Sequence, residues 1–350
     1  MLSGSEASRV TAFGTLSDGT PIERHVLSNA SGMEVSFLTL GGIITSVMAP
    51  DRHGNLSDVT PGFDRLEDYL ADPHFLGALV GRYANRIAGG RFVIDGETFT
   101  IPPNAGPNLL HGGPSGFHRA VWRAEPFDQH GMTGVALRYT SPPGEGGFPG
   151  TLDVTATYSL TNANELSLDY VAHADRPTPC NITQHIYFNL AGHRSGSVLD
   201  HELTIAASEV LELDDEQIPT GRTVPVAGTA FDFRHQHAIS EAMRSAPLLG
   251  AGFDHTFVLR DGARAARLVE LGSGRTLEVE TTEPGLQLYT GNHLSAVRGK
   301  GGAHYHPHDA LALETQHFPN SPNVPQFPDT ILRLGGEYRS RTVYRFGVSG

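Results

Sequence analysis

The chain has 350 residues with 38 acidic and 25 basic side chains, and its formal net charge is −13. Nucleic acids and anionic membranes are bound by concentrated Lys and Arg, so this charge argues against both as partners. The 41 Gly and 23 Pro demand many turns, and 39% hydrophobic residues suffice for a sizeable core, so we expect strands and loops rather than long helices.

Runs in which apolar and polar residues alternate predict β-strands along the whole chain. The clearest runs from 151 to 160, and the run at 166–170 follows a Thr-Asn-Ala-Asn turn, so we expect these two to form an antiparallel hairpin. Similar runs lie at 34–40, 91–94, 135–139, 267–271, 276–281 and 330–334. This spacing predicts an all-β fold, a large antiparallel sandwich.

Helical patterns are confined to short pieces at 64–70 and 238–244, so nothing supports a nucleotide-binding α/β fold. The glycine-rich stretch 299–302 lacks the residue order of a phosphate-binding loop. The sequence shows no repeat and no interdomain linker, and the Pro-rich stretch 141–150 is expected to be a surface loop. We therefore expect a single domain over residues 1–350.

The cellular context is predicted from what the sequence lacks. Cys180 is the one cysteine, which excludes an internal disulfide and a cysteine-rich metal site. The opening MLSGSEASRV lacks the basic and then apolar order of a secretory signal, and no apolar run is long enough to span a bilayer. We expect a cytoplasmic protein that exists as a monomer or a weak homodimer.

The segment TPCNITQHIYFNLAG, residues 178–192, carries the most concentrated chemistry in the sequence. We expect one strand here, because successive strand side chains point to opposite faces and one face would be apolar except for Gln184. The other face would combine five polar groups: Asn181, Thr183, His185, Tyr187 and Asn189. Such a face is typical of a ligand-binding floor, although the outer face of an ordinary edge strand would show the same pattern.

Two glycine-rich segments add further candidates. GRYANRIAGG contains Asn85 and Arg86, and the guanidinium of Arg86 has a planar fork of donors suited to sugar hydroxyls or to a carboxylate. NLLHGG places His111 before two glycines that permit close approach of a ligand. A plain salt bridge for Arg86 and an incidental loop position for His111 are the alternatives.

Three segments near the C-terminal end complete the set. Asp254 directly precedes an apolar strand, and Gln287 shares a strand face with Tyr289. Glu314 directly follows the apolar run 310–313, so burial should raise the pKa of its carboxyl group and keep it basic. The alternatives are a turn-capping aspartate, a surface amide and an exposed strand-end glutamate.

The histidine-rich stretch HYHPH, 304–308, does not predict a metal site, because it lacks a nearby acidic residue within the segment and the chain lacks further cysteines. We expect no metal at this loop.

Taken together, these segments resemble the aldose 1-epimerase (galactose mutarotase) family, in order and over nearly the whole length. The resemblance is carried by DVTPGFDRLEDY, GRYANRIAGG, NLLHGG, NITQHIYFNLAG, PVAGTAFDFR, GFDHTFVL, PGLQLYTGN and LETQHFPNSPN. It implies a single-domain β-supersandwich with few short helices, a free aldose sugar bound in an open cleft, and no metal or organic cofactor.

The same resemblance implies roles for individual residues. His185 matches the general acid of the family and Glu314 its general base, while five residues match sugar-contacting positions, and we place Tyr187 beside them. Those five are Asn85, Arg86, His111, Asp254 and Gln287. Interconversion of α and β anomers requires a base and an acid together. We expect His185 protonated and Glu314 ionised at the start, with Asp254 raising the pKa of the imidazole.

Three rival functions stay open. A glycosidase would use two carboxylates, whereas the strongest segments offer one carboxylate and one imidazole. A non-catalytic carbohydrate-binding module would require neither His185 nor Glu314. An epimerase of phosphorylated hexose would require a clustered cationic pocket. The sequence does not define the preferred aldose among galactose, glucose, xylose and arabinose.

Overall fold

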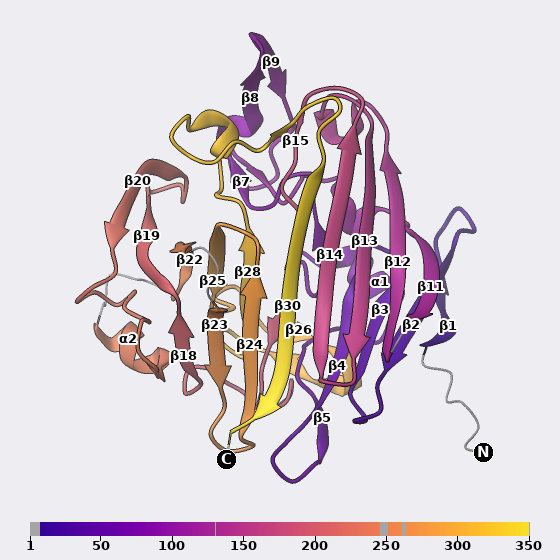
Figure 1. The fold of residues 1–350 in the computed structure, drawn as a ribbon, viewed down its shortest axis with the longest axis vertical. Coiled ribbons are helices and arrows are strands. Elements are labelled where there is room, and N and C mark those ends of the chain that lie inside the picture. The colour runs from indigo at the N-terminus through magenta and orange to yellow at the C-terminus, as the bar shows by residue number, and fades with distance from the viewer. Residues whose placement is uncertain (1–7, 130, 246–250, 261–263, 350) are drawn as a thin grey trace.

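The computed structural model describes residues 8–129, 131–245, 251–260 and 264–349. Its largest element is a nine-stranded antiparallel sheet, whose long strands run from end to end of the molecule in Figure 1. In sheet order its strands are β11 (Arg123–Gln129), β12 (Met132–Ser141), β13 (Leu152–Thr161), β14 (Glu165–Ala174), β30 (Tyr338–Val348), β24 (Arg275–Thr281), β23 (Arg264–Val269), β18 (Glu202–Ile205) and β21 (His237–Ala238).

Two further sheets pack against one face of the nine-stranded sheet. A six-stranded sheet has the order β17 (Tyr187–Phe188), β28 (Leu311–Gln316), β25 (Gly285–Tyr289), β22 (Asp254–Leu259), β19 (Ala207–Leu213) and β20 (Pro219–Pro225). A five-stranded sheet follows chain order through β1 (Ser8–Thr15), β2 (Pro21–Ser28), β3 (Glu34–Leu38), β4 (Ile44–Pro50) and β5 (Leu56–Asp58). The result is the predicted antiparallel sandwich.

Short elements connect these sheets. Five two-stranded pairs are β7 (Arg86–Ile87) with β10 (Leu109–Leu110), β6 (Leu79–Val80) with β16 (Thr183–Gln184), β15 (Thr178–Pro179) with β29 (Ile331–Leu332), β8 (Arg91–Ile94) with β9 (Glu97–Thr100), and β26 (Val297–Arg298) with β27 (His304–Tyr305). The α-helices among the described residues are α1 (Leu66–Ala71) and α2 (Ile239–Ser245), close to the two predicted helical segments. None of the described helices is long and apolar enough to cross a membrane.

Single-turn 3₁₀ helices occupy several loops. They lie at Ala88–Gly90, Phe117–Arg119, Glu145–Gly147, Lys300–Gly302 and Ser321–Asn323. The turn Glu145–Gly147 lies within the loop predicted at 141–150.

The alternation of β13 shows why this sequence forms a sandwich. Leu152, Val154 and Ala156 are buried, while Asp153 between the first two is exposed. Burial of one large apolar side chain stabilises the fold by roughly 1.5–3 kcal/mol. The main core cluster draws such residues from all three sheets, between Leu27 and Phe346. The single domain over residues 1–350 stays a prediction.

The prediction of one continuous strand over 178–192 is wrong. The segment forms three two-residue strands, β15, β16 and β17, which pair with three different partners. Its polar face is also used differently from the predicted floor. The side chains of Asn181, Thr183 and Asn189 donate hydrogen bonds to main-chain carbonyls, so they hold loops together rather than face a ligand. The apolar face is buried in the core as expected.

Candidate active site

The candidate site is a cleft of about 130 Å³ beside the six-stranded sheet. It collects side chains that are far apart in the sequence. The lining residues are Pro73, His74, Phe75, Asn85, Arg86, Leu110, His111, His185, Tyr187, Asp254, Tyr289, His293 and Glu314. Seven of the eight predicted site residues are therefore brought together, and Gln287 lies directly behind them, bonded to Asp254.

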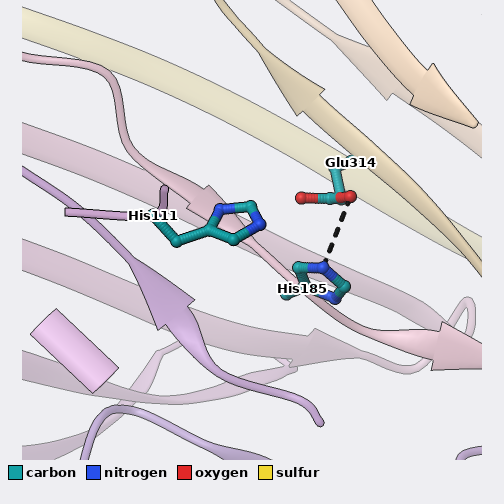
Figure 2. Close-up of side chains that lie close together, drawn as sticks. All are labelled: His111, His185 and Glu314. Carbon is teal, nitrogen blue, oxygen red and sulfur yellow. Dashed lines mark ion pairs between the residues drawn. The ribbon is translucent and has the colours of Figure 1, made fainter. Parts of the chain in front are cut away.

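His185 and Glu314 form the centre of the cleft. The Nε2 atom of His185 lies 3.6 Å from Oε1 of Glu314 (Figure 2). Both side chains are almost fully buried. Glu314 belongs to β28, whose six residues are all buried, while the main chain of His185 bonds to Gly77 and Ala78 of a neighbouring loop. These contacts fix both groups at the bottom of the cleft.

Each member of this pair keeps one polar atom free. Within the described part of the chain, Nδ1 of His185 and Oε2 of Glu314 have no hydrogen-bond partner. Buried polar atoms are nearly always bonded, so these two unpaired atoms make the pair exceptional.

Burial changes the protonation of both groups. It raises the pKa of Glu314 well above its usual value, and the charge of Asp254 adds to this rise while that of Arg86 opposes it. Burial lowers the pKa of His185 to about 4. The expectation of a protonated imidazole whose pKa is raised by Asp254 is therefore wrong, because loss of hydration dominates and Asp254 acts on Glu314 instead.

His111 faces the same space from a loop after β10. Burial lowers the pKa of its imidazole well below the usual value, with further contributions from His185, Arg86 and His118. Its Nδ1 accepts a hydrogen bond from the main-chain N–H of Asn85 at 3.2 Å. His111 is therefore a neutral imidazole whose other nitrogen, Nε2, points toward the acid–base pair in Figure 2.

Arg86 and Asp254 form a charged pair that lines the same cleft. Nη2 of Arg86 is 4.0 Å from Oδ2 of Asp254, and the amide of Gln287 donates to Oδ1 of Asp254 at 2.6 Å. The orientation of the amide is fixed because its oxygen accepts the hydroxyl proton of Thr256. Arg86 and Asp254 keep unused donors and acceptors that suit sugar hydroxyls.

Aromatic side chains line the cleft. The ring of Tyr187 lies 4.9 Å from that of His185, and its hydroxyl donates to the carbonyl of His74 at 2.9 Å. Phe75 has its ring centroid 4.8 Å from that of His111 and 6.2 Å from that of His185. These contacts keep water from the imidazoles and explain their low pKa values.

Several lining residues of the cleft were not predicted from the sequence. Pro73, His74, Phe75, Leu110 and His293 were not singled out, and Tyr289 was noted without a role. The loop at 73–75 shows no alternation, and its shape depends on Asp72, whose carboxylate accepts main-chain N–H groups of His74 and Leu76. The DPHF order, with an aspartate opening a turn, was the one local signal available.

His111, His185 and Glu314 are also the one group of three potential metal ligands found in the described ranges, with ligating atoms within 4.8 Å of one another. Their surroundings fit a metal poorly. A histidine that binds metal usually donates its second ring N–H to an acceptor. Here Nδ1 of His111 accepts an N–H instead, and Nδ1 of His185 has no described partner. The HYHPH stretch does not belong to this group.

The all-β sandwich, with a buried carboxyl–imidazole pair in a cleft lined by hydrogen-bonding side chains, is an arrangement that suits a carbohydrate isomerase. Comparison with known proteins gives the family. The sequence model of the aldose 1-epimerase family matches residues 23–345. The chain belongs to this family.

Characterised relatives match along nearly the whole chain. Galactose mutarotase from Mus musculus is 44% identical over 344 residues, covering 97% of this chain and 98% of the relative. Aldose 1-epimerase from Escherichia coli strain K12 is 40% identical over 337 residues, covering 94% and 96%. Among solved structures, galactose 1-epimerase from Lactobacillus acidophilus has a TM-score of 0.86 at 29% identity, covering 98% of this chain and 99% of that one.

Proposed function

We propose that this protein interconverts the α and β anomers of free aldohexoses, with Glu314 and His185 as the proton-transfer pair. One observation carries the proposal: a carboxyl oxygen and an imidazole nitrogen lie 3.6 Å apart in a buried cleft, each beside an unpaired polar atom. The ring oxygen O5 and the hydroxyl oxygen O1 of a pyranose are attached to the same carbon. Two groups this close can therefore reach both oxygens at once.

The reaction balances without any further reactant. Glu314 removes the proton of the C1 hydroxyl, the C1–O5 bond breaks, and O5 takes a proton from His185, giving the open-chain aldehyde. After rotation about C1–C2, O5 attacks the other face of the carbonyl. His185 then recovers its proton from O5 and Glu314 returns its proton to O1. Both groups end in their starting protonation states.

The pKa values of His185 and Glu314 determine which of the two residues holds the shared proton before substrate binds. An imidazolium beside a carboxylate contains the same number of protons as a neutral imidazole beside a carboxylic acid, so the two forms differ by one proton transfer. Burial favours the neutral form, because it disfavours both charges. Sugar hydroxyls that donate to the Glu314 carboxylate favour the charged form. We propose that substrate binding moves the proton onto His185.

The remaining cleft residues bind the sugar. Arg86 and His111 offer N–H donors to hydroxyl or ring oxygens, while Asp254 accepts from hydroxyls. The side chain of Asn85 contributes a further donor, and Tyr187 packs beside the acid. Gln287 matched a sugar-contacting position in the sequence, and we propose that it binds hydroxyls together with Asp254, which it orients.

The relatives support this choice of reaction, since the mouse protein is named a galactose mutarotase and the bacterial one an aldose 1-epimerase. The rivals have weaker support. Arg86 is the one arginine or lysine among the lining residues of the described cleft, which is too little charge for a phosphorylated hexose. The second carboxylate, Asp254, is bonded to Gln287, which suits a binding role better than that of a glycosidase acid.

Polarimetry of freshly dissolved α-D-galactose and α-D-glucose tests the proposed reaction. We expect the purified protein to speed the decay of optical rotation for at least one sugar. Binding without acceleration would favour a carbohydrate-binding module, and release of nitrophenol from a nitrophenyl glycoside would favour a glycosidase. A single domain, a cytoplasmic location and a monomeric or weakly dimeric state complete the proposal. Light scattering coupled to gel filtration tests the last of these.

A further inference from the structure

We propose that the main chain of Asn85 fixes His111 as the tautomer with its proton on Nε2, which makes His111 a permanent hydrogen-bond donor and not a proton carrier. The inference concerns a positioning residue, Asn85, that acts through its backbone. It deepens the proposed function, on which it rests only for the identity of the group that accepts the hydrogen bond from Nε2–H.

The two residues are joined by a reciprocal pair of hydrogen bonds. The main-chain N–H of His111 donates to the carbonyl of Asn85 at 3.1 Å. In return, the main-chain N–H of Asn85 donates to Nδ1 of His111 at 3.2 Å. Together they tie the His111 ring to the main chain that leads into β7, so the ring has little freedom to rotate.

Both residues of this hydrogen-bonded pair have unusual backbone angles. Asn85 has φ = 62° and His111 has φ = 52°, both in the left-handed region that residues with a side chain rarely adopt. Asparagine tolerates this region better than most residues. The side chain of Asn85 supports its own conformation, because its Oδ1 accepts the next main-chain N–H, that of Arg86, at 2.8 Å. Such angles persist where the surrounding structure requires them.

The chemistry of imidazole then leaves one tautomer. A backbone N–H can donate and cannot accept, so the nitrogen facing it must have a free lone pair. In neutral imidazole one nitrogen accepts and the other donates, so the proton of His111 resides on Nε2. Protonation of Nδ1 would place two N–H groups against each other in a buried site. Burial also lowers the pKa of His111, for the independent reason of lost hydration.

This tautomer defines what His111 offers to a ligand. Figure 2 shows its ring directed toward the space beside Glu314 and His185. The Nε2–H is therefore presented where the reacting oxygens of a sugar would lie. It stabilises negative charge that develops on an oxygen, while the transferable proton stays with the His185 and Glu314 pair. The same tautomer has no lone pair on Nε2 for a metal ion.

Nitrogen NMR of the histidine side chains tests the tautomer without reference to activity. In ¹⁵N-labelled protein, with the His111 signals assigned by comparison with His111→Gln, we expect the Nε2–H pattern. We also expect it to persist between about pH 5 and pH 8, where an unperturbed histidine titrates. An Nδ1–H pattern, or protonation of His111 in this range, would overturn the inference and leave the proposed function standing.

Two pairs of variants test the consequence. The amide nitrogen of glutamine reaches the place of Nε2, whereas that of asparagine reaches the place of Nδ1. We therefore expect His111→Gln to retain at least about tenfold more kcat/KM than His111→Asn.

Asn85→Gly and Asn85→Ala both lose the carboxamide, but glycine keeps the left-handed backbone without strain. Asn85→Gly should keep the Nε2–H pattern and have a higher kcat/KM than Asn85→Ala. Equal losses of kcat/KM within both pairs of variants would contradict the inference.

Discussion

The Nε2 atom of His185 lies 3.6 Å from Oε1 of Glu314, and burial reverses the usual order of their pKa values, because it lowers that of His185 to about 4 and raises that of Glu314 well above its usual value. A proton shared by the pair therefore resides on Glu314, and hydroxyl groups that donate to the carboxylate favour its transfer to His185. We propose that substrate binding supplies this change, so that the pair acts with no need for a strong acid or a strong base.

The first prediction concerns the pH profile. The pair is active while it holds one shared proton. Activity should fall as pH drops through about 4, where neutral His185 gains a proton beside protonated Glu314. On the alkaline side it should fall through the raised pKa of Glu314, where the shared proton is lost. We expect a bell-shaped plot of kcat/KM against pH for mutarotation. An acid limb at the usual pKa of histidine would contradict this assignment.

The second prediction concerns Arg86. Removal of its guanidinium in Arg86→Ala should raise KM by roughly 10- to 100-fold, because hydrogen bonds from a charged donor are lost. The kcat value should change less, since Arg86 does not transfer a proton. Arg86→Lys keeps the charge but not the planar fork, so its KM should lie between the two. Steady-state polarimetry measures both constants, and an unchanged KM in Arg86→Ala would exclude Arg86 as a sugar contact.

The third prediction concerns Gln287, which bonds both Asp254 and Thr256. Gln287→Leu should lower the free energy of unfolding by about 1–3 kcal/mol, because it leaves buried partners unpaired, and it should also raise KM. Gln316→Met is the matched control. Gln316 is fully buried on the neighbouring strand β28, and its amide has no partner among the described residues. Urea unfolding should show no loss in Gln316→Met, and equal losses in both would refute the argument.

The fourth prediction concerns metal ions. Because Nδ1 of His111 accepts the Asn85 N–H, the group of His111, His185 and Glu314 should bind Zn²⁺ weakly despite its two imidazoles and one carboxylate. Neither EDTA nor micromolar Zn²⁺ should change the rate of mutarotation. Isothermal titration of the protein with Zn²⁺ checks binding directly. A stoichiometric site that is lost in His111→Gln would show that the tautomer does not prevent metal binding.

The sequence predicted the sandwich well where strands bury one face and expose the other. The predicted hairpin over 151–170 is present as β13 and β14, because an alternating strand buries its apolar face in only one register. The same alternation in the segment 178–192 did not predict its structure correctly. Its polar side chains, such as Thr183 and Asn189, bond to distant main-chain groups, and no local pattern reports that.

Seven of the eight predicted residues line one cleft, but the electrostatics of this cleft could not be predicted from the sequence. Burial, with a smaller contribution from His74, lowers the pKa of His185, and burial depends on packing of Phe75 and Tyr187 that the sequence does not show. Phe75 itself has a left-handed backbone angle, φ = 55°, which is rare for a bulky side chain. Its place beside the imidazoles results from tertiary contacts of the loop at 73–75.

The most direct test of the acid–base pair is exchange spectroscopy of glucose or galactose anomers with the wild type, His185→Ala, Glu314→Gln and the double variant. If the two residues transfer protons in one concerted unit, each single variant should lose roughly 10²–10⁴-fold in exchange rate, and the double variant little more than either one. Losses that multiply in the double variant, or a single variant that keeps the wild-type rate, would contradict the account.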